Sequence, residues 1–185
     1  MNHKVLSALV SIAVSVTDAF CAVSAEAQTS AAGPYYAVPS WDQKLPSSTR
    51  FIVLSNWNNE AVLDRETGLV WERTLGGGIS DWFVANSTCI VKTVGGRLGW
   101  HLPTIQELAS LIDPSVAAPG PTLPAGHPFI NVAAAGYWSS TSQAPAATQA
   151  WTVDFSSGFI LGFREKGTTF RNVWCTRGGQ TVDPQ

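Results

Sequence analysis

Residues 97–113, RLGWHLPTIQELASLID, constrain the fold more than any other stretch, because they define where a helix begins and which face it buries. Thr104 stands three residues before Glu107, which is the spacing of a capping box at a helix N-terminus. Pro103 holds the chain before the cap in an extended conformation. Apolar residues recur at helical spacing, and Asp113 precedes a proline that ends the helix. We therefore expect a loop rich in glycine and tryptophan, followed by an amphipathic helix of about ten residues.

The N-terminus has the pattern of a signal peptide. Lys4 supplies a positive start, an apolar run follows over residues 5–16, and small residues precede a cleavage point after Ala27. The apolar run is too short to span a bilayer comfortably. We expect a secreted or periplasmic protein that does not span the membrane after processing. The predicted parts are a signal peptide at 1–27, a flexible leader at 28–50, one folded domain at 51–179 and a tail at 180–185.

The chain contains three cysteines. The residues before Cys21 lack the pattern of a lipoprotein signal, so we expect this residue to be removed with the signal peptide, and lipid attachment is the alternative. The remaining pair, Cys89 and Cys175, predicts a disulfide in an exported chain. Two free thiols acting as metal ligands or nucleophiles are the alternative, but no histidine or third cysteine stands at ligand spacing beside either one.

The order of predicted elements indicates an α+β fold with two helices packed on antiparallel strands. A helix that begins at Ser80 places Trp82, Ala85 and Cys89 on one face. Five prolines mark an irregular loop over residues 114–128. Alternating or continuous apolar runs give the predicted strands, which lie at residues 51–54, 61–64, 69–72, 136–141, 151–155 and 159–163. A last strand carries Val173 and Cys175 on one face and ends at Gly178-Gly179.

Six ordered fragments carry a family resemblance: LDRETGLVWE, Trp82 with Ala85 and Cys89, GWHLPTIQELASLID, YWSST, AWTVDFSSG and VWCTRGG. Over residues 51–179 the chain resembles the C-terminal domain family of the Legionella collagen-like adhesin. One departure is visible, since His101 stands where the family usually has arginine. The resemblance implies a C-type-lectin-like fold, a disulfide between the first helix and the last strand, and binding of sulfated polysaccharides.

The sequence offers little that is typical of an enzyme. It has no G-x-S-x-G elbow, no P-loop and no H-E-x-x-H motif. Oxidation of a substrate cysteine, as in the formylglycine-generating enzymes of the related fold, would need a close cysteine pair near the C-terminus, where this chain has only Cys175. The residue clusters of calcium-dependent lectins are also missing. We therefore expect a non-enzymatic protein without a cofactor or a metal.

A group of cationic residues near the C-terminus gives the candidate ligand site: Arg164, Lys166, Arg171 and Arg177. Arginine forks suit sulfate and carboxylate groups, so an acidic polysaccharide is the ligand that this group favours. Trp100 and Trp138 are candidates for stacking on sugar rings. The alternatives are a solvated hairpin for the cations and core packing for the tryptophans.

The function that we expect is therefore binding by an exported domain, with adhesin-like recognition of acidic or sulfated glycans. A structural or protein-interaction module of the cell envelope is the alternative. Nucleic acid is not an expected partner, because the formal net charge of the chain is −2 at pH 7 and nucleic-acid-binding domains usually carry a basic excess.

Overall fold

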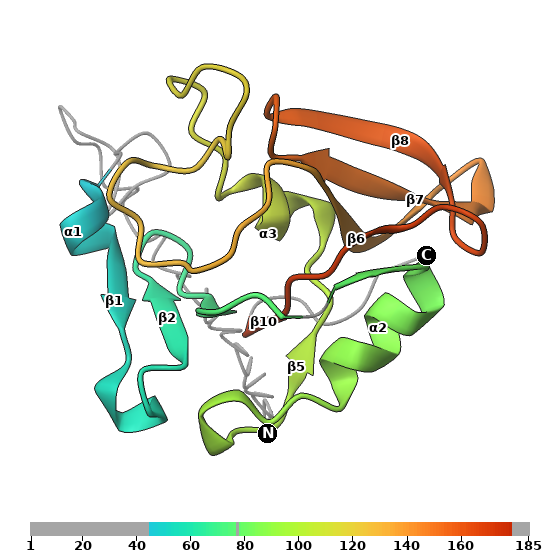
Figure 1. Ribbon diagram of the computed structural model, residues 1–185. Coiled ribbons are helices and arrows are strands. Elements are labelled where there is room, and N and C mark those ends of the chain that lie inside the picture. The colour runs from blue at the N-terminus through green and yellow to red at the C-terminus, as the bar shows by residue number, and fades with distance from the viewer. Residues whose placement is uncertain (1–44, 77, 179–185) are drawn as a thin grey trace, which may run out of the picture. The chain divides into compact units, whose positions relative to one another are not determined.

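A computed structural model describes residues 45–76 and 78–178, and it has a mixed α+β fold with two five-stranded sheets (Figure 1). The predicted signal peptide, most of the predicted leader and the predicted tail lie outside the described residues. A short helix, α1 (Ser47–Arg50), precedes the first strand, and Arg50 is buried. The packed part of the chain therefore begins within the range predicted as a leader.

The first sheet contains the β-meander that the sequence predicts. Its strands are β1 (Phe51–Val53), β2 (Ala61–Asp64), β3 (Val70–Glu72), β10 (Thr176–Arg177) and β5 (Trp100–His101), in that order. All neighbouring strands are antiparallel. The turn between β2 and β3 needs a positive φ at Gly68, which glycine adopts without strain. β10, from the end of the domain, thus lies between β3 and β5.

The second sheet is built around the C-terminal strands. Its order is β4 (Ile79–Ser80), β9 (Arg171–Asn172), β6 (Gly136–Gln143), β7 (Ala146–Asp154) and β8 (Phe159–Glu165). Only the contact between β6 and β9 is parallel. Val153 and Phe155 are buried, whereas Asp154 between them lines the outer side of the sheet. The alternation of residues 151–155 therefore predicts the burial of Val153 and Phe155 correctly, but Thr152 on the opposite face is buried as well, at 1 % exposed.

Helix α3 (Ile105–Ala109) confirms the predicted capping box but is shorter than expected. The Thr104 hydroxyl accepts from the Glu107 N–H, and the Glu107 carboxylate accepts from the Thr104 N–H. After Ser110 the backbone bonds change from i→i−4 to i→i−3, and the Asp113 N–H then donates to the Thr122 carbonyl. The helix ends early because the chain turns into the Pro-rich loop before the proline at 114 is reached.

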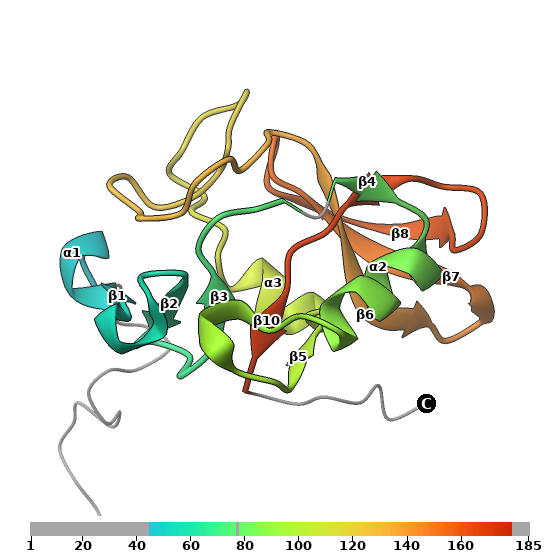
Figure 2. The same ribbon diagram turned by 60° about the horizontal axis from the view of Figure 1, so that its bottom comes forward.

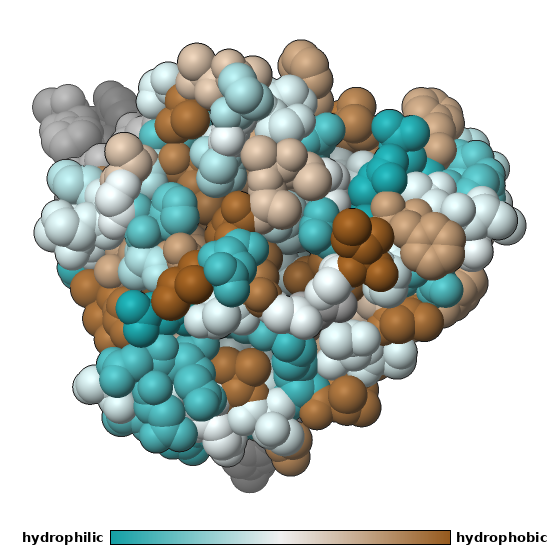
Figure 3. Space-filling model, in the orientation of Figure 1, coloured by the Kyte–Doolittle hydropathy of each residue, from teal (hydrophilic) through white to brown (hydrophobic). Residues whose placement is uncertain are grey.

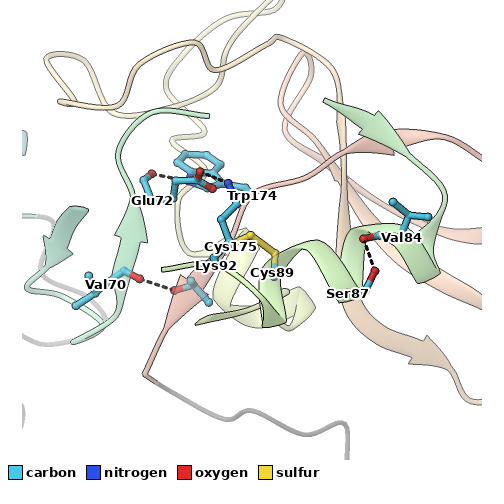
Figure 4. Close-up of a disulfide and its surroundings, with 9 residues drawn as sticks. Val70, Glu72, Val84, Ser87, Cys89, Lys92, Trp174 and Cys175 are labelled. Atoms are coloured by element: carbon cyan, nitrogen blue, oxygen red, sulfur yellow. Dashed lines mark hydrogen bonds and ion pairs between the residues drawn. A yellow bond between two sulfur atoms is a disulfide. The ribbon is translucent and has the colours of Figure 1, made fainter. Parts of the chain in front are cut away.

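Helix α2 (Trp82–Ile90) begins one residue later than predicted, with Asp81 rather than Ser80 as its cap. The Asp81 carboxylate accepts from the Val84 N–H at 2.9 Å. Cys89 on the inner face forms the disulfide with Cys175, so this pairing is confirmed (Figure 4). A bridge that closes a loop of 86 residues stabilises the fold by about 4–5 kcal/mol in the chain-entropy model.

The last predicted strand is confirmed only in its second part, where β10 forms, and is wrong at residues 173–175. Val173, Trp174 and Cys175 are buried, but they form no strand and connect β9 in one sheet to β10 in the other (Figure 2). All three side chains are buried because the segment passes through the interior between the two sheets. Trp174 packs against an aromatic cluster there, and its indole N–H donates to the Glu72 carbonyl.

Candidate functional site

The structure divides the predicted cationic group into a pair and two separate residues. Arg164 on β8 and Arg171 on β9 line one cavity of about 230 Å³ on the outer face of the second sheet. Lys166 and Arg177 do not line this cavity. The candidate site is therefore narrower than the sequence predicts, and we call this cavity the arginine pocket.

Strands β6 and β7 form the floor of the arginine pocket. Gly136 opens β6, and Thr152 and Asp154 lie on the outer side of β7. Asp154 caps the turn that follows β7, because its Oδ1 accepts from both the N–H and the hydroxyl of Ser156, at 2.8 Å and 2.6 Å. Asp154 is the acidic side chain among the residues that line the pocket.

The electrostatics of the arginine pocket favour an anion. The Arg164 Nε atom is buried, and no hydrogen-bond partner for it exists among the described residues. Desolvation and then the nearby guanidinium of Arg164 lower the pKa of Arg171, whereas the Asp154 carboxylate acts in the opposite direction. Two guanidinium groups thus line the pocket beside one carboxylate, and the buried Arg164 Nε–H has no acceptor among the described residues.

A glycine allows Arg171 to take its place. A Cβ atom at Gly136 would lie 2.7 Å from the Arg171 Cδ and 2.8 Å from its Nε, closer than real Cβ contacts. The Arg171 side chain therefore crosses the backbone of β6 at a point where no other residue leaves room. The neighbouring Asn172 side chain bonds to the Gly136 carbonyl at 3.2 Å, which also holds β9 against β6.

Apolar side chains border the arginine pocket. Phe170 is 57 % exposed and Ile79 is 67 % exposed, and both are among the lining residues. Figure 3 shows hydrophobic and hydrophilic atoms mixed over the side of the molecule that carries β7 and β8. The pocket therefore combines cationic groups with accessible apolar surface, the two components that a charged sugar contacts.

Lys166 has a structural role, so its assignment to the ligand group is corrected. Its side chain is buried, its ammonium donates to the Ser142 hydroxyl at 2.6 Å, and it lies 4.2 Å from the centre of the Trp82 ring. These contacts hold the start of the β8–β9 connection against the start of α2. Buried in this way, the ammonium does not present its charge to a ligand.

Arg177 belongs to a different part of the molecule. It lies on β10 in the first sheet, where its Nε donates to the Leu98 carbonyl at 2.8 Å. The guanidinium groups of Arg177 and Arg97 both lie over the Trp57 ring, at 5.5 Å and 5.4 Å from its centre. This second cationic group is distinct from the arginine pocket, because β10 and β8 are in different sheets.

The assignment of Trp100 and Trp138 as sugar-stacking residues is corrected, because both are buried. Trp100 is 2 % exposed and Trp138 is fully buried. Their indole N–H groups donate inside the protein, to the carbonyls of Arg97 and Ser80. A ring without an exposed face cannot stack on a sugar, so both residues are part of the core, as the alternative from the sequence states.

His101 lies in the interior of the domain and does not line the arginine pocket. His101 is buried on β5, and its Nε2 lies 3.6 Å from the Glu107 carboxylate. Within residues 45–76 and 78–178, no three His, Cys, Asp or Glu side chains are grouped so that they could hold a metal ion. None of the helices in these ranges has both the length and the hydrophobicity of a transmembrane segment.

Sequence reasoning missed Asp154, Gly136 and Phe170 as members of the candidate site. For Asp154 a signal exists, because the alternation with Val153 and Phe155 places it on the outer face of the strand. For Gly136 and Phe170 there is none, because their place in the pocket depends on the contact of β9 with β6, and these strands lie far apart in the sequence.

Comparison with known proteins identifies a family. The sequence model of the Lcl C-terminal domain matches residues 60–177, which is more than half of the chain. The resemblance to this family that the motifs indicate is therefore confirmed. The match includes both cysteines of the disulfide and all of the residues that line the arginine pocket. A comparison with curated proteins finds no match.

Proposed function

We propose that this chain, which belongs to the Lcl C-terminal domain family, is an exported, non-enzymatic binding domain that holds an acidic group of a glycan between Arg164 and Arg171. The observation that carries the proposal is the unequal number of charges in the arginine pocket. Two guanidinium groups and one carboxylate line it, and the buried Arg164 Nε–H has no acceptor within the part of the chain that the structure describes. A sulfate or carboxylate would accept from this N–H and offset the excess positive charge.

The size of the arginine pocket favours a charged substituent of a longer chain. Its volume of about 230 Å³ is below the range of pockets that enclose a drug-sized ligand. The acidic group would enter the pocket, while the sugar ring that carries it contacts Phe170 and Ile79 at the rim. The name of the family and the resemblance to an adhesin domain support a role in recognition, and no catalytic role is associated with this family.

Export and the finer fold assignment are parts of the same proposal. The Cys89–Cys175 disulfide supports export, because such bonds persist in oxidising compartments. The same bond supports a C-type-lectin-like fold, because it joins α2 to the segment that leads into the last strand. N-terminal sequencing of the exported protein would test cleavage after Ala27.

The test is a glycan array followed by calorimetry, carried out on the exported protein with its disulfide intact. The probes are a sulfated polysaccharide, a carboxylated uronate polymer and a neutral polymer of similar length. We expect the sulfated polysaccharide, the uronate polymer or both to bind. Arg164→Ala and Arg171→Ala should each weaken this binding at least tenfold, because each variant removes a charge-assisted hydrogen bond. Binding should also weaken as salt rises.

Two matched controls locate the site. Arg65 is an exposed arginine in the turn after β2, so Arg65→Ala should leave binding unchanged. Arg177→Ala tests the second cationic group in the first sheet. Binding that is lost with Arg177→Ala but kept with Arg164→Ala would contradict the assignment to the arginine pocket. An array on which no acidic glycan binds would overturn the proposal.

A further inference from the structure

Asp154 offers a hydrogen-bond acceptor to a ligand of the arginine pocket. Its Oδ1 accepts from both the N–H and the hydroxyl of Ser156, which fixes the carboxylate at the end of β7. Its Oδ2 forms no hydrogen bond and no ion pair within residues 45–76 and 78–178, although Arg164 and Arg171 line the same cavity. The second oxygen of this half-buried carboxylate therefore remains as an acceptor for a ligand.

Two polar side chains beside Asp154 use their hydrogens inside the protein. Thr152 donates its hydroxyl to the Leu161 carbonyl at 3.1 Å, so this residue offers no proton to a ligand. The Asn172 amide donates to the Gly136 carbonyl at 3.2 Å. The arginine pocket thus presents guanidinium donors together with a carboxylate acceptor. A ligand that satisfies both kinds of group needs an acidic group and, close to it, a hydrogen-bond donor.

We propose that the arginine pocket selects a uronate over a sulfate ester, and that Asp154 is the residue that makes this selection. The selection rests on the glycan-binding function proposed above. A free uronate carries its carboxylate next to a carbon that bears a hydroxyl, so the acid and the donor belong to one edge of the sugar. The planar carboxylate accepts from the guanidinium groups of Arg164 and Arg171, while this hydroxyl donates to the Asp154 Oδ2.

A sulfate ester has the same single charge but the wrong arrangement of acceptors. Its three terminal oxygens point in different directions around the sulfur, and none of them carries a proton. When two of these oxygens face the guanidinium groups of a small cavity, the third is directed toward the remaining wall, which includes Asp154. Two negatively charged acceptors without a proton between them repel each other, so Asp154 disfavours the sulfate ester.

The first experiment compares single sugars on the exported protein with its disulfide intact. The probes are glucuronate, 4-deoxyglucuronate, glucose 6-sulfate and glucose, and the NMR signals of the Arg164 and Arg171 Nε–H groups report binding at the pocket. We expect glucuronate to bind about tenfold more tightly than either glucose 6-sulfate or 4-deoxyglucuronate, because only glucuronate supplies both the carboxylate and the neighbouring donor. Glucose should leave the signals unchanged.

The second experiment repeats these titrations with Asp154→Asn. The amide keeps an oxygen that can accept from Ser156 and replaces the Oδ2 by an NH2 donor, so the turn after β7 is retained. The preference for glucuronate over glucose 6-sulfate should fall at least tenfold, since the repulsion of the sulfate is removed. Glucuronate and 4-deoxyglucuronate should then bind equally well, because the acceptor for the hydroxyl is gone.

Glu165→Gln is the matched control. It also removes one negative charge, from the residue that follows Arg164 on β8, but Glu165 does not line the arginine pocket. Its sugar preferences should equal those of the unchanged protein. Tighter or equal binding of glucose 6-sulfate by the unchanged protein would overturn the selection by Asp154, and so would preferences that persist in Asp154→Asn. If neither acidic sugar shifts the arginine signals, the glycan-binding proposal itself fails together with this selection.

Discussion

Arginine has opposite roles in the two sheets of this molecule. Arg50, beside the first sheet, is 2 % exposed and meets two carboxylates. Its Nε and Nη2 bond to the two oxygens of Asp64 at 2.9 Å and 2.8 Å, its Nη1 lies 2.9 Å from Glu66, and Nη2 also bonds to the Ser110 carbonyl. Every part of this guanidinium therefore has an acceptor, and the residue connects α1 to β2 and to the end of α3.

The arginine pocket of the second sheet has the reverse ratio. Arg164 and Arg171 line it together with one carboxylate, that of Asp154, whose Oδ1 accepts two bonds from Ser156. The difference shows that the number of arginines in a cluster does not by itself indicate whether the cluster binds a ligand. The ratio of guanidinium groups to buried acceptors separates an arginine that stabilises the fold from one that is available to a ligand.

The strongest test of this comparison is to replace one arginine in each region. Arg50→Met leaves Asp64 buried without its partner, so we expect the free energy of unfolding to fall by about 3–5 kcal/mol. Arg164→Met should change it by less than about 1 kcal/mol, because no buried carboxylate loses a hydrogen bond. Urea denaturation monitored by tryptophan fluorescence measures both values. Equal losses in the two variants would contradict the comparison.

A smaller loss of stability is expected when the ion pair between Glu72 and Lys92 is broken. Glu72 pairs with Lys92, but its buried Oε2 has no hydrogen-bond partner among residues 45–76 and 78–178, and burial raises the pKa of Glu72 despite the lysine. Lys92→Met should lower the free energy of unfolding by about 1–3 kcal/mol at pH 7, less than a fully buried pair loses, because Lys92 is partly exposed.

The pH dependence of Lys92→Met checks the cause. A carboxyl group whose folded pKa is raised binds more protons in the folded protein than in the unfolded chain. Its unfavourable contribution to the free energy of unfolding therefore grows as pH rises from the ordinary pKa of a glutamate to the raised pKa of the folded state. The deficit of Lys92→Met relative to the unchanged protein should therefore shrink as pH falls toward the ordinary pKa of a glutamate. Denaturation curves at several pH values measure it, and a deficit that is constant with pH would show that packing alone is lost.

The smallest change in stability is expected for Gly136→Ala. The new Cβ would displace the flexible Arg171 side chain, which can move at little cost, so unfolding should shift by less than about 1 kcal/mol. Binding of an acidic glycan should nevertheless weaken several-fold, because one of the two guanidinium groups leaves its place. Gly76→Ala, where a Cβ meets nothing within 4 Å, is the matched control. Unchanged glycan affinity in Gly136→Ala would show that the position of Arg171 is not required.

Local signals in the sequence predicted the local parts of this fold well. The capping box at Thr104, the meander of β1 to β3 and the alternation in β7 each depend on residues close together in the chain, where spacing decides the conformation. The disulfide was also predictable, because only two cysteines follow the predicted signal peptide.

The candidate site could be predicted only in part, because it depends on contacts between distant strands. Arg164 and Lys166 are two residues apart, yet the first lines the arginine pocket and the second packs on Trp82, since β8 ends between them. Arg177 is six residues from Arg171 but lies in the other sheet. These cations are close together in the sequence, but the path of the chain between the two sheets separates them in space.

The place of β10 has a consequence for how the chain reaches its final form. This strand comes from the end of the domain and completes the first sheet between β3 and β5, next to the cysteine that α2 must find. A chain that is threaded from its N-terminus through a narrow channel therefore cannot close this sheet, or form its covalent bridge, until nearly the last residues have passed. In the export that we propose, the first sheet therefore closes only after the residues of β10 have crossed the membrane.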